Sequence, residues 1–220
     1  MLAIELNSNN IPPLQLEDTV EKALQLFSDF RVTHLPVVSE EKFLGLISEE
    51  DLSDVHNKNT IIELLQKDLI SASINENDHF LNAVNFSNQF QTNIVPVINF
   101  DKELVGTISG QTLLRTLGNF LGLQEIGGII VLEMERNQFA ISEISRIVES
   151  NEAHVLHLNT TIQPETGLLR VTIHINKKEL STVVAAFERY EYDVVHYFGE
   201  EKFENEIHSN YRHLMNYLDI

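Results

Sequence analysis

The sequence predicts an α+β protein made of two parts, an α/β part built from a repeated unit and a second part with the element order βαββαβ. Three observations lead to this prediction. The chain has 220 residues, enough for two compact units of about 100 residues each. Its first half contains an internal repeat with a period of 60 residues. After Gly122 the repeat ends and a different pattern of strands and helices begins.

The repeat is visible when the chain is shifted by 60 residues, and one extra residue before Gly106 then moves the register to 61. Neither copy, at about 50 residues, could bury its apolar face alone, so we expect the two copies to pack into one body. Residues that coincide in the two copies are Asp18 with Asp78, Ala23 with Ala83, Phe30 with Phe90, Pro36 with Pro96, Val37 with Val97 and Lys42 with Lys102.

Each copy predicts the order strand, helix, strand, turn, strand, helix. The stretch TVEKALQLFSDF places its apolar residues on one helical face, and the second copy repeats this face. A proline-containing strand follows, HLPVV or IVPVI, and then a charged turn. The next strand, FLGLIS or LVGTIS, ends in a serine that opens the second helix.

Beyond Gly122 the predicted elements are a strand (GGIIVLEM), a helix (AISEISRIVESN), two strands around a PETG turn, a helix (KELSTVVAAFERY) and a strand (DVVHYF). This βαββαβ order is that of a ferredoxin-like fold, here spanning 123–200. Residues 201–220 form a predicted C-terminal amphipathic helix whose apolar stripe would dock on this protein, on a twin subunit or on a recruited partner. Its stripe is Phe203, Ile207, Tyr211, Leu214 and Leu218.

Composition excludes several classes of function. The net charge of -18 makes nucleic acid an improbable partner, because such a surface repels phosphate backbones. The absence of cysteine excludes disulfides and thiolate chemistry and is compatible with the cytoplasm. No basic leader or apolar run of about 20 residues occurs, so we expect a soluble cytoplasmic protein without a membrane segment. No catalytic motif is found, and we expect no enzymatic activity.

The repeated proline strand and the stretch GLISEEDL resemble a tandem pair of cystathionine-β-synthase (CBS) domains over roughly the first 120 residues. Under this resemblance repeat 1 covers about 1–58 and repeat 2 about 59–122. Residues 123–200 resemble an ACT domain, a module that often binds amino acids. CBS pairs followed by such a module resemble regulatory proteins of the acetoin-utilisation type.

The resemblance implies that an adenine nucleotide, AMP, ADP or ATP, binds as a regulatory ligand, without any prosthetic group. In matching CBS modules the serine contacts phosphate and the aspartate takes two ribose hydroxyls, which assigns these roles to Ser48 and Asp51. The same residues also fit a simple helix-capping box, and both interpretations stay open. The other implied contacts are Gly45, His34, Leu35, Pro36 and Leu14 in the first copy, with Ser109, Thr112, Gly106, Ile94, Val95, Pro96 and Ile74 in the second.

The two implied sites are unequal, because the second copy has Thr112 where the first has Asp51. A carboxylate accepts hydrogen bonds from two hydroxyls at once, so the first site is the better predicted nucleotide site. Glu49 and Glu50 repel phosphate, which favours AMP or adenosine over ATP unless Mg²⁺ or a basic residue compensates. The candidate basic residues are Lys42, Lys102 and Arg115.

Two features of the second part bear on ligands. ACT domains commonly have a glycine in the turn after their first strand, and Phe139 occupies this position, so we expect no tight binding of amino acids. If the PETG hairpin pairs Gln163 with Leu168, His157 lies opposite His174. Two histidines do not complete a zinc site, so exposed cross-strand residues are the preferred interpretation and no metal is expected.

The favoured function is therefore a non-enzymatic sensor of adenine nucleotides, and we expect a homodimer. Two alternatives remain, a dimerising scaffold with degenerate sites and an amino-acid sensor that acts through the ACT-like part.

Overall fold

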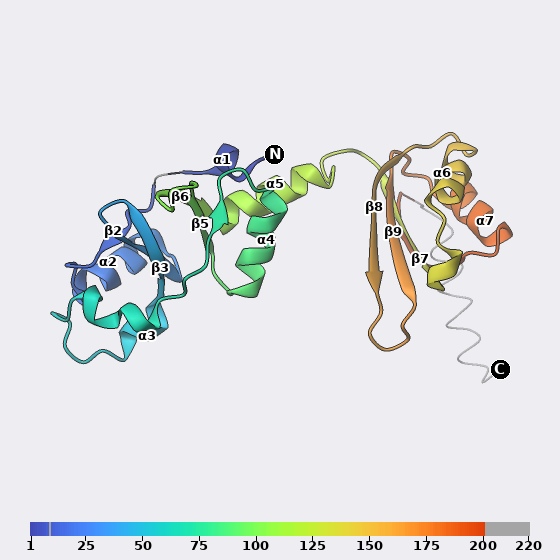
Figure 1. Cartoon of the computed structure of the whole chain (residues 1–220). Helices are drawn as coiled ribbons and strands as arrows, with labels where there is room; N and C mark the ends of the chain where they lie inside the picture. Colours follow the sequence, from blue (N-terminus) through green and yellow to red (C-terminus); the bar gives the residue numbers. More distant parts are fainter. Residues whose placement is uncertain (9, 201–220) are drawn as a thin grey trace. The chain divides into compact units, whose positions relative to one another are not determined.

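The computed structural model describes residues 1–8 and 10–200 and divides the chain into two compact units, Met1–Leu117 (unit 1) and Gly118–Ile220 (unit 2), shown in Figure 1. Small sheets and helices alternate in both units, which confirms the predicted α+β class. The amphipathic helix predicted for 201–220 lies outside the described residues.

Unit 1 contains the two copies of the repeat, each with a three-stranded sheet in which the first strand is parallel and the last antiparallel to the middle one. The predicted order of elements is confirmed in both copies. The first copy has β1 (Leu14–Gln15), α2 (Val20–Phe30), β2 (His34–Ser39), β3 (Lys42–Ser48) and α3 (Glu49–Ser53). The second has β4 (Ile74–Asn75), α4 (Phe80–Gln89), β5 (Ile94–Ile98), β6 (Leu104–Ser109) and α5 (Gly110–Phe120).

The repeated aspartates close the turn that precedes the first helix of each copy. The Asp18 carboxylate accepts a hydrogen bond from the backbone N–H of Gln15 at 2.9 Å, and Asp78 accepts one from Asn75 at 2.9 Å. The backbone carbonyl of each of these residues also anchors the segment of chain that leads into the other copy. The carbonyl of Asp18 accepts from Ile62 at the start of η1 (Ile62–Asp68), and that of Asp78 accepts from Ala3 at the start of α1 (Ala3–Leu6).

The two copies complete each other's sheets. Ile70, which leads into the second copy, exchanges two backbone hydrogen bonds of 2.9 and 3.0 Å with Leu46 of β3 in the first copy. Ser8, which leads into the first copy, exchanges two bonds of 2.9 and 3.0 Å with Thr107 of β6 in the second. The buried core is continuous across both copies, so they form one body as expected.

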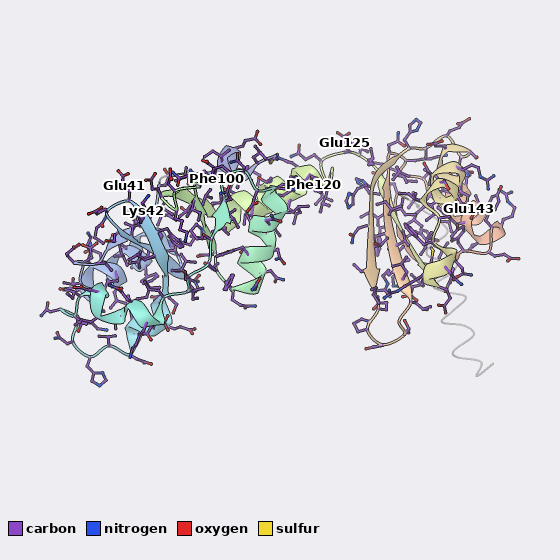
Figure 2. All side chains as sticks on the ribbon, in the orientation of Figure 1. Glu41, Lys42, Phe100, Phe120, Glu125 and Glu143 are labelled. Carbon is purple, nitrogen blue, oxygen red and sulfur yellow. The ribbon has the colours of Figure 1, made fainter. Side chains whose placement is uncertain are left out.

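The two β-hairpin turns of unit 1 are also joined. Phe43 N–H donates to the Lys102 carbonyl at 2.9 Å, and Leu104 N–H donates to the Glu41 carbonyl at 3.0 Å. Lys42 adds an ion pair of 2.9 Å with Glu103. Figure 2 labels Glu41 and Lys42 at this end of unit 1, where the ring of Phe100 is 80% exposed.

Unit 2 has the predicted βαββαβ order, and its antiparallel sheet has the strand order β10-β7-β9-β8. Helices α6 and α7 cover one face of the sheet (Figure 1) and enclose a second core. The Tyr192 hydroxyl, at the start of the last strand, donates to Glu143 of α6 at 3.0 Å. The elements are β7 (Gly128–Met134), η2 (Arg136–Gln138), α6 (Ile141–Glu149), β8 (Val155–Ile162), β9 (Leu169–Ile175), α7 (Ser181–Arg189) and β10 (Asp193–Phe198).

Gly45 is the residue of β3 on which the segment joining the two copies rests. A Cβ atom there would lie 2.8 Å from Leu69 Cβ and 3.0 Å from the Ile70 carbonyl oxygen. We therefore expect Gly45→Ala to lower the free energy of unfolding by about 1–3 kcal/mol, as overpacking typically does. Urea denaturation followed by circular dichroism measures this loss.

The control is Gly118→Ala in helix α5. A new Cβ there would lie 4.0 Å from its nearest neighbour, Leu123 Cδ1. This variant should keep or gain stability, because alanine is favoured over glycine within a helix. Equal stability of Gly45→Ala and the wild type would contradict the close approach of the joining segment.

Candidate functional site

The start of α3 is a complete capping box. Ser48 Oγ accepts a hydrogen bond from the Asp51 backbone N–H at 3.1 Å. The Asp51 carboxylate oxygen Oδ2 in turn accepts from Ser48 Oγ at 2.5 Å and from Ser48 N–H at 3.3 Å. Asp51 is exposed, and its second oxygen, Oδ1, has no hydrogen-bond partner among the described residues. The carboxylate therefore stabilises the helix start and still has free acceptor capacity.

The start of α5 repeats the cap with different chemistry. Ser109 Oγ accepts from the Thr112 N–H at 3.2 Å and donates to Thr112 Oγ1 at 3.0 Å. The first turn of α5 contains no acidic residue, whereas the first turn of α3 contains three, Glu49, Glu50 and Asp51. Negative charge near a helix N-terminus disfavours an additional anion, so the two starts differ electrostatically.

His34 is paired with Ser48 across the β2–β3 hairpin. It lies on β2 directly opposite Ser48 of β3, and it is only 8% exposed. Its Nδ1 atom lies 2.9 Å from the Thr33 hydroxyl. Burial lowers the pKa of the imidazole below its ordinary value, while the nearby carboxylates of Asp51 and Glu50 act in the opposite direction. In the second copy the corresponding position opposite Ser109 is Ile94, which cannot ionise.

Thr33 and Asn93, 60 residues apart, form a reciprocal pair between the copies. Thr33 N–H donates to Asn93 Oδ1 at 2.9 Å, and Asn93 N–H donates to Thr33 Oγ1 at 3.3 Å. The Thr33 hydroxyl also lies 3.2 Å from Asn93 Oδ1. Their carbonyls accept from the first residues of the two capped helices, Glu49 at 3.0 Å and Gly110 at 2.7 Å. The two capped helix starts are thus held next to one shared pair.

An open cavity of about 490 Å³ lies beside this pair. Its walls come from α4, α5 and the segments that precede β2 and β5, and they mix polar with apolar side chains. None of Ser48, Asp51, Ser109 and Thr112 lines the cavity, although Gly110 follows Ser109 directly. The lining residues are Thr33, Val84, Ser87, Asn88, Gln91, Thr92, Asn93, Gly110, Leu113, Leu114 and Leu117.

The apolar residues predicted to contact a ligand belong to the hydrophobic core. Their side chains are buried among those of both copies, so only their backbone groups could meet a bound molecule. Gly45 is also occupied, since the joining segment of the chain packs directly on it. The buried residues are Leu14, Leu35, Pro36, Ile74, Ile94, Val95 and Pro96, and Gly106 lies buried in β6.

The basic residues proposed to balance a phosphate are not all within reach. Lys42 and Ser48 lie at opposite ends of β3, about 20 Å apart at the rise of a strand. The ammonium of Lys42 instead pairs with Glu103, whose hydrogen bond raises the pKa of Lys42. Lys102 lies in the turn before β6, at the end opposite Ser109. Of the three residues, only Arg115 is on a capped helix, where it is exposed.

Sequence reasoning missed Thr33 and Asn93. They occupy equivalent positions of the repeat, immediately before the two proline-containing strands, and this coincidence was the available signal. In unit 2 the predicted register is confirmed, because Gln163 N–H donates to Leu168 and His157 lies opposite His174. The expectation that both histidines are exposed is wrong for His174, which is only 8% exposed on a central strand of the sheet. The described residues contain no cluster of three or more His, Cys, Asp or Glu side chains suited to a metal ion.

A comparison with protein families matches residues 3–57 to the CBS domain. A CBS domain pair/ACT domain protein from Thermotoga maritima superposes on 55% of this chain and 99% of its own, with a TM-score of 0.50 and 19% identity. This similarity shows the fold, and the internal repeat of unit 1 agrees with the fold of a CBS domain pair.

Among curated proteins, a homoserine O-acetyltransferase from Methanobrevibacter ruminantium is 25% identical over 119 residues, 53% of this chain and 24% of that protein. An inosine-5'-monophosphate dehydrogenase from Thermoplasma acidophilum is 24% identical over 98 residues, 44% of this chain and 20% of that protein. The chain therefore spans about a quarter or less of the length of these relatives. Across the described part of the chain, no helix combines the length and apolar character needed to cross a membrane.

The buried His34 makes a prediction about pH. Its folded-state pKa is lowered from 6.5, so between that lowered pKa and 6.5 the unfolded chain holds more protons than the folded one. The free energy of unfolding should therefore fall as the pH drops from 6.5 through the folded pKa. Urea denaturation of the wild type and His34→Gln, at about pH 7.5 and about pH 5.5, should show a smaller loss in the variant.

The matched control is His56→Gln, at an exposed histidine of the same CBS domain. It should lose as much stability on acidification as the wild type does. If His34→Gln and the wild type respond identically to pH, burial of a neutral imidazole at this position is refuted.

Proposed function

We propose that this protein is a non-enzymatic cytoplasmic regulator whose CBS pair binds an adenine nucleotide. One observation carries the proposal: two serine-capped helix starts meet at the Thr33–Asn93 pair, beside a cavity that is lined by the second copy and by Thr33 of the first. The cavity, at about 490 Å³, lies within the range of about 300–1,000 Å³ typical of small-molecule sites. Its mixture of amide, hydroxyl and leucine side chains suits a ligand with an apolar ring and several hydroxyl groups.

Asp51 is proposed as the main ribose contact. Its free Oδ1 atom can accept one hydroxyl, and Oδ2 can exchange its bond from Ser48 for a second. Thr112 offers a neutral hydroxyl that Ser109 already engages. Charge-assisted hydrogen bonds contribute about 1.5–3 kcal/mol and neutral ones about 1 kcal/mol, so the first site should be stronger.

The charge around Asp51 selects among adenine ligands. Glu49 and Glu50 lie exposed in the same helical turn, and Lys42 lies too far along β3 to offset them. Each carboxylate repels a nearby phosphate by about 1 kcal/mol in water. AMP or a neutral adenosine should therefore bind more tightly than ATP at this site, unless Mg²⁺ accompanies the triphosphate.

Titration calorimetry of AMP and ATP into the full chain tests these roles. We expect AMP to bind the wild type more tightly than ATP does. Asp51→Ala should lower the affinity for AMP roughly 10-fold or more. Thr112→Ala should lower it roughly 5-fold, in line with the two classes of hydrogen bond. The control is Asp54→Ala, which removes an exposed carboxylate from the opposite end of α3.

Three results would count against the assignment. A loss of affinity in Thr112→Ala alone would reverse the order of the two sites. An equal loss in Asp54→Ala would mean that Asp51 acts through the stability of α3 and not through a direct contact with the ligand. If neither nucleotide binds the wild type, GLISEED is a capping box only, and the scaffold hypothesis gains support.

The amino-acid sensor is the weaker alternative, if unit 2 is an ACT-like domain as its order of elements suggests. Phe139, in the turn between β7 and α6, packs against the core of unit 2. A ring in this position leaves no glycine for close approach of a ligand to the backbone. A thermal-shift screen against amino acids and nucleotides separates the hypotheses, because a ligand at 100 times its dissociation constant stabilises the fold by about 2.7 kcal/mol.

We also propose that the protein is a homodimer that packs through the helices of its CBS pair. Leu114 on α5 is 72% exposed and Leu81 on α4 is 39% exposed, so these helices leave apolar surface uncovered. Light scattering at micromolar protein should give twice the chain mass of 25.1 kDa. Leu114→Asp should shift the mass towards one chain.

The control for the dimer is Leu64→Asp, which changes a leucine of η1 that is 67% exposed. This variant should retain the dimer mass. A wild-type monomer would contradict the dimer, and dissociation of Leu64→Asp instead of Leu114→Asp would place the interface elsewhere.

A further inference from the structure

Thr33 and Asn93 connect the two copies through reciprocal hydrogen bonds. Each residue accepts, through its side chain, a hydrogen bond from the backbone N–H of the other. Each also accepts, through its carbonyl, a bond from the first residue of a capped helix, Glu49 for Thr33 and Gly110 for Asn93. The amide nitrogen of Asn93 further donates to the Arg31 carbonyl at 3.0 Å, which ties it to the end of α2.

These bonds form one chain from the start of α3 to the start of α5. Its links run from Glu49 to Thr33, from Thr33 to Asn93, and from Asn93 to Gly110. A backbone shift at either helix start must therefore lengthen a link or move the pair. Thr33 and Asn93 both have exposed side chains and both line the cavity, so a ligand held beside them would also restrict their motion.

We propose that Thr33 and Asn93 are positioning residues that couple the two candidate sites of the CBS pair. Binding at one site fixes the shared pair, and the second ligand then pays less of the cost of ordering it. The coupling is positive, and we expect AMP at one site to raise the affinity of the other site roughly 5-fold above its value without the first ligand, at the lower end of typical allosteric coupling. This inference rests on the proposed function, since it concerns ligands of the same sites.

The first experiment is calorimetry of AMP with the full chain. The wild type should show two binding events, and the ratio of their affinities should include the increase caused by the first bound AMP. Thr33→Val removes the hydroxyl that accepts from Asn93 but keeps the backbone bond to Glu49, and Asn93→Leu removes the amide. In both variants the ratio should fall to that of independent sites. Asn93→Asp keeps the acceptor for Thr33 N–H and should restore most of the coupling.

The matched control is Asn82→Leu, the same chemical change at an exposed asparagine of α4 that does not line the cavity. Asn82 is not part of the chain of hydrogen bonds, so its substitution should leave the ratio of affinities unchanged. Loss of the ratio in Asn82→Leu as well would assign the effect to a general change in unit 1 and overturn the role of the pair.

The second experiment needs no ligand and distinguishes failure of the coupling from failure of the proposed function. Ser109→Ala removes the cap of α5, and hydrogen exchange followed by nuclear magnetic resonance then reports on the Glu49 amide of α3. Through the pair, Ser109→Ala should raise the exchange rate of Glu49 roughly 5-fold. In an Asn93→Leu background the same change should have no effect on Glu49.

The outcomes are separable. If AMP does not bind but Ser109→Ala alters exchange at Glu49 only when Asn93 is present, the coupling stands and the nucleotide proposal fails. If AMP binds and the pair variants change neither the ratio of affinities nor exchange at Glu49, the coupling is wrong and the nucleotide proposal survives.

Discussion

In unit 1, the last strand of each repeat forms backbone hydrogen bonds with the segment that leads into the other repeat. Ile70 pairs with Leu46 of β3, and Ser8 pairs with Thr107 of β6. Because buried backbone groups must find hydrogen-bond partners, neither copy can be removed without exposing the strand of its neighbour. The absence of a side chain at Gly45 follows from the same exchange, since the joining segment lies directly on it.

The exchange also creates the near-symmetry of the candidate site. Two equivalent residues, Thr33 and Asn93, meet where the copies adjoin, and each supports one capped helix. The chemistry placed on this symmetric frame is unequal, because Asp51 and the buried His34 stand in one copy where Thr112 and Ile94 stand in the other. A duplicated scaffold can in this way hold two sites of different affinity without a change of fold.

Unit 2 follows a different principle, in which one face of an antiparallel sheet is buried under two helices. The turn fixes the hairpin register, because the pairing of β8 with β9 runs regularly from the PETG turn back to His157, which lies opposite His174. The turn after β7 is closed by Phe139, which packs against the core. The nucleotide sites that we propose therefore lie in unit 1 alone.

The sequence by itself determined the local elements and the Ser48 capping box, because these depend on residues a few positions apart and on the side-chain periods of helices and strands. It also determined the repeat, because equivalent residues recur 60 positions apart. The same reasoning correctly placed Ser48 and Asp51 together. Only the tertiary structure decided that Lys42 lies at the far end of β3, that His34 is buried, and that Thr33 contacts Asn93. Such contacts join residues far apart in the chain, and their geometry is set by how whole sheets pack rather than by any local preference.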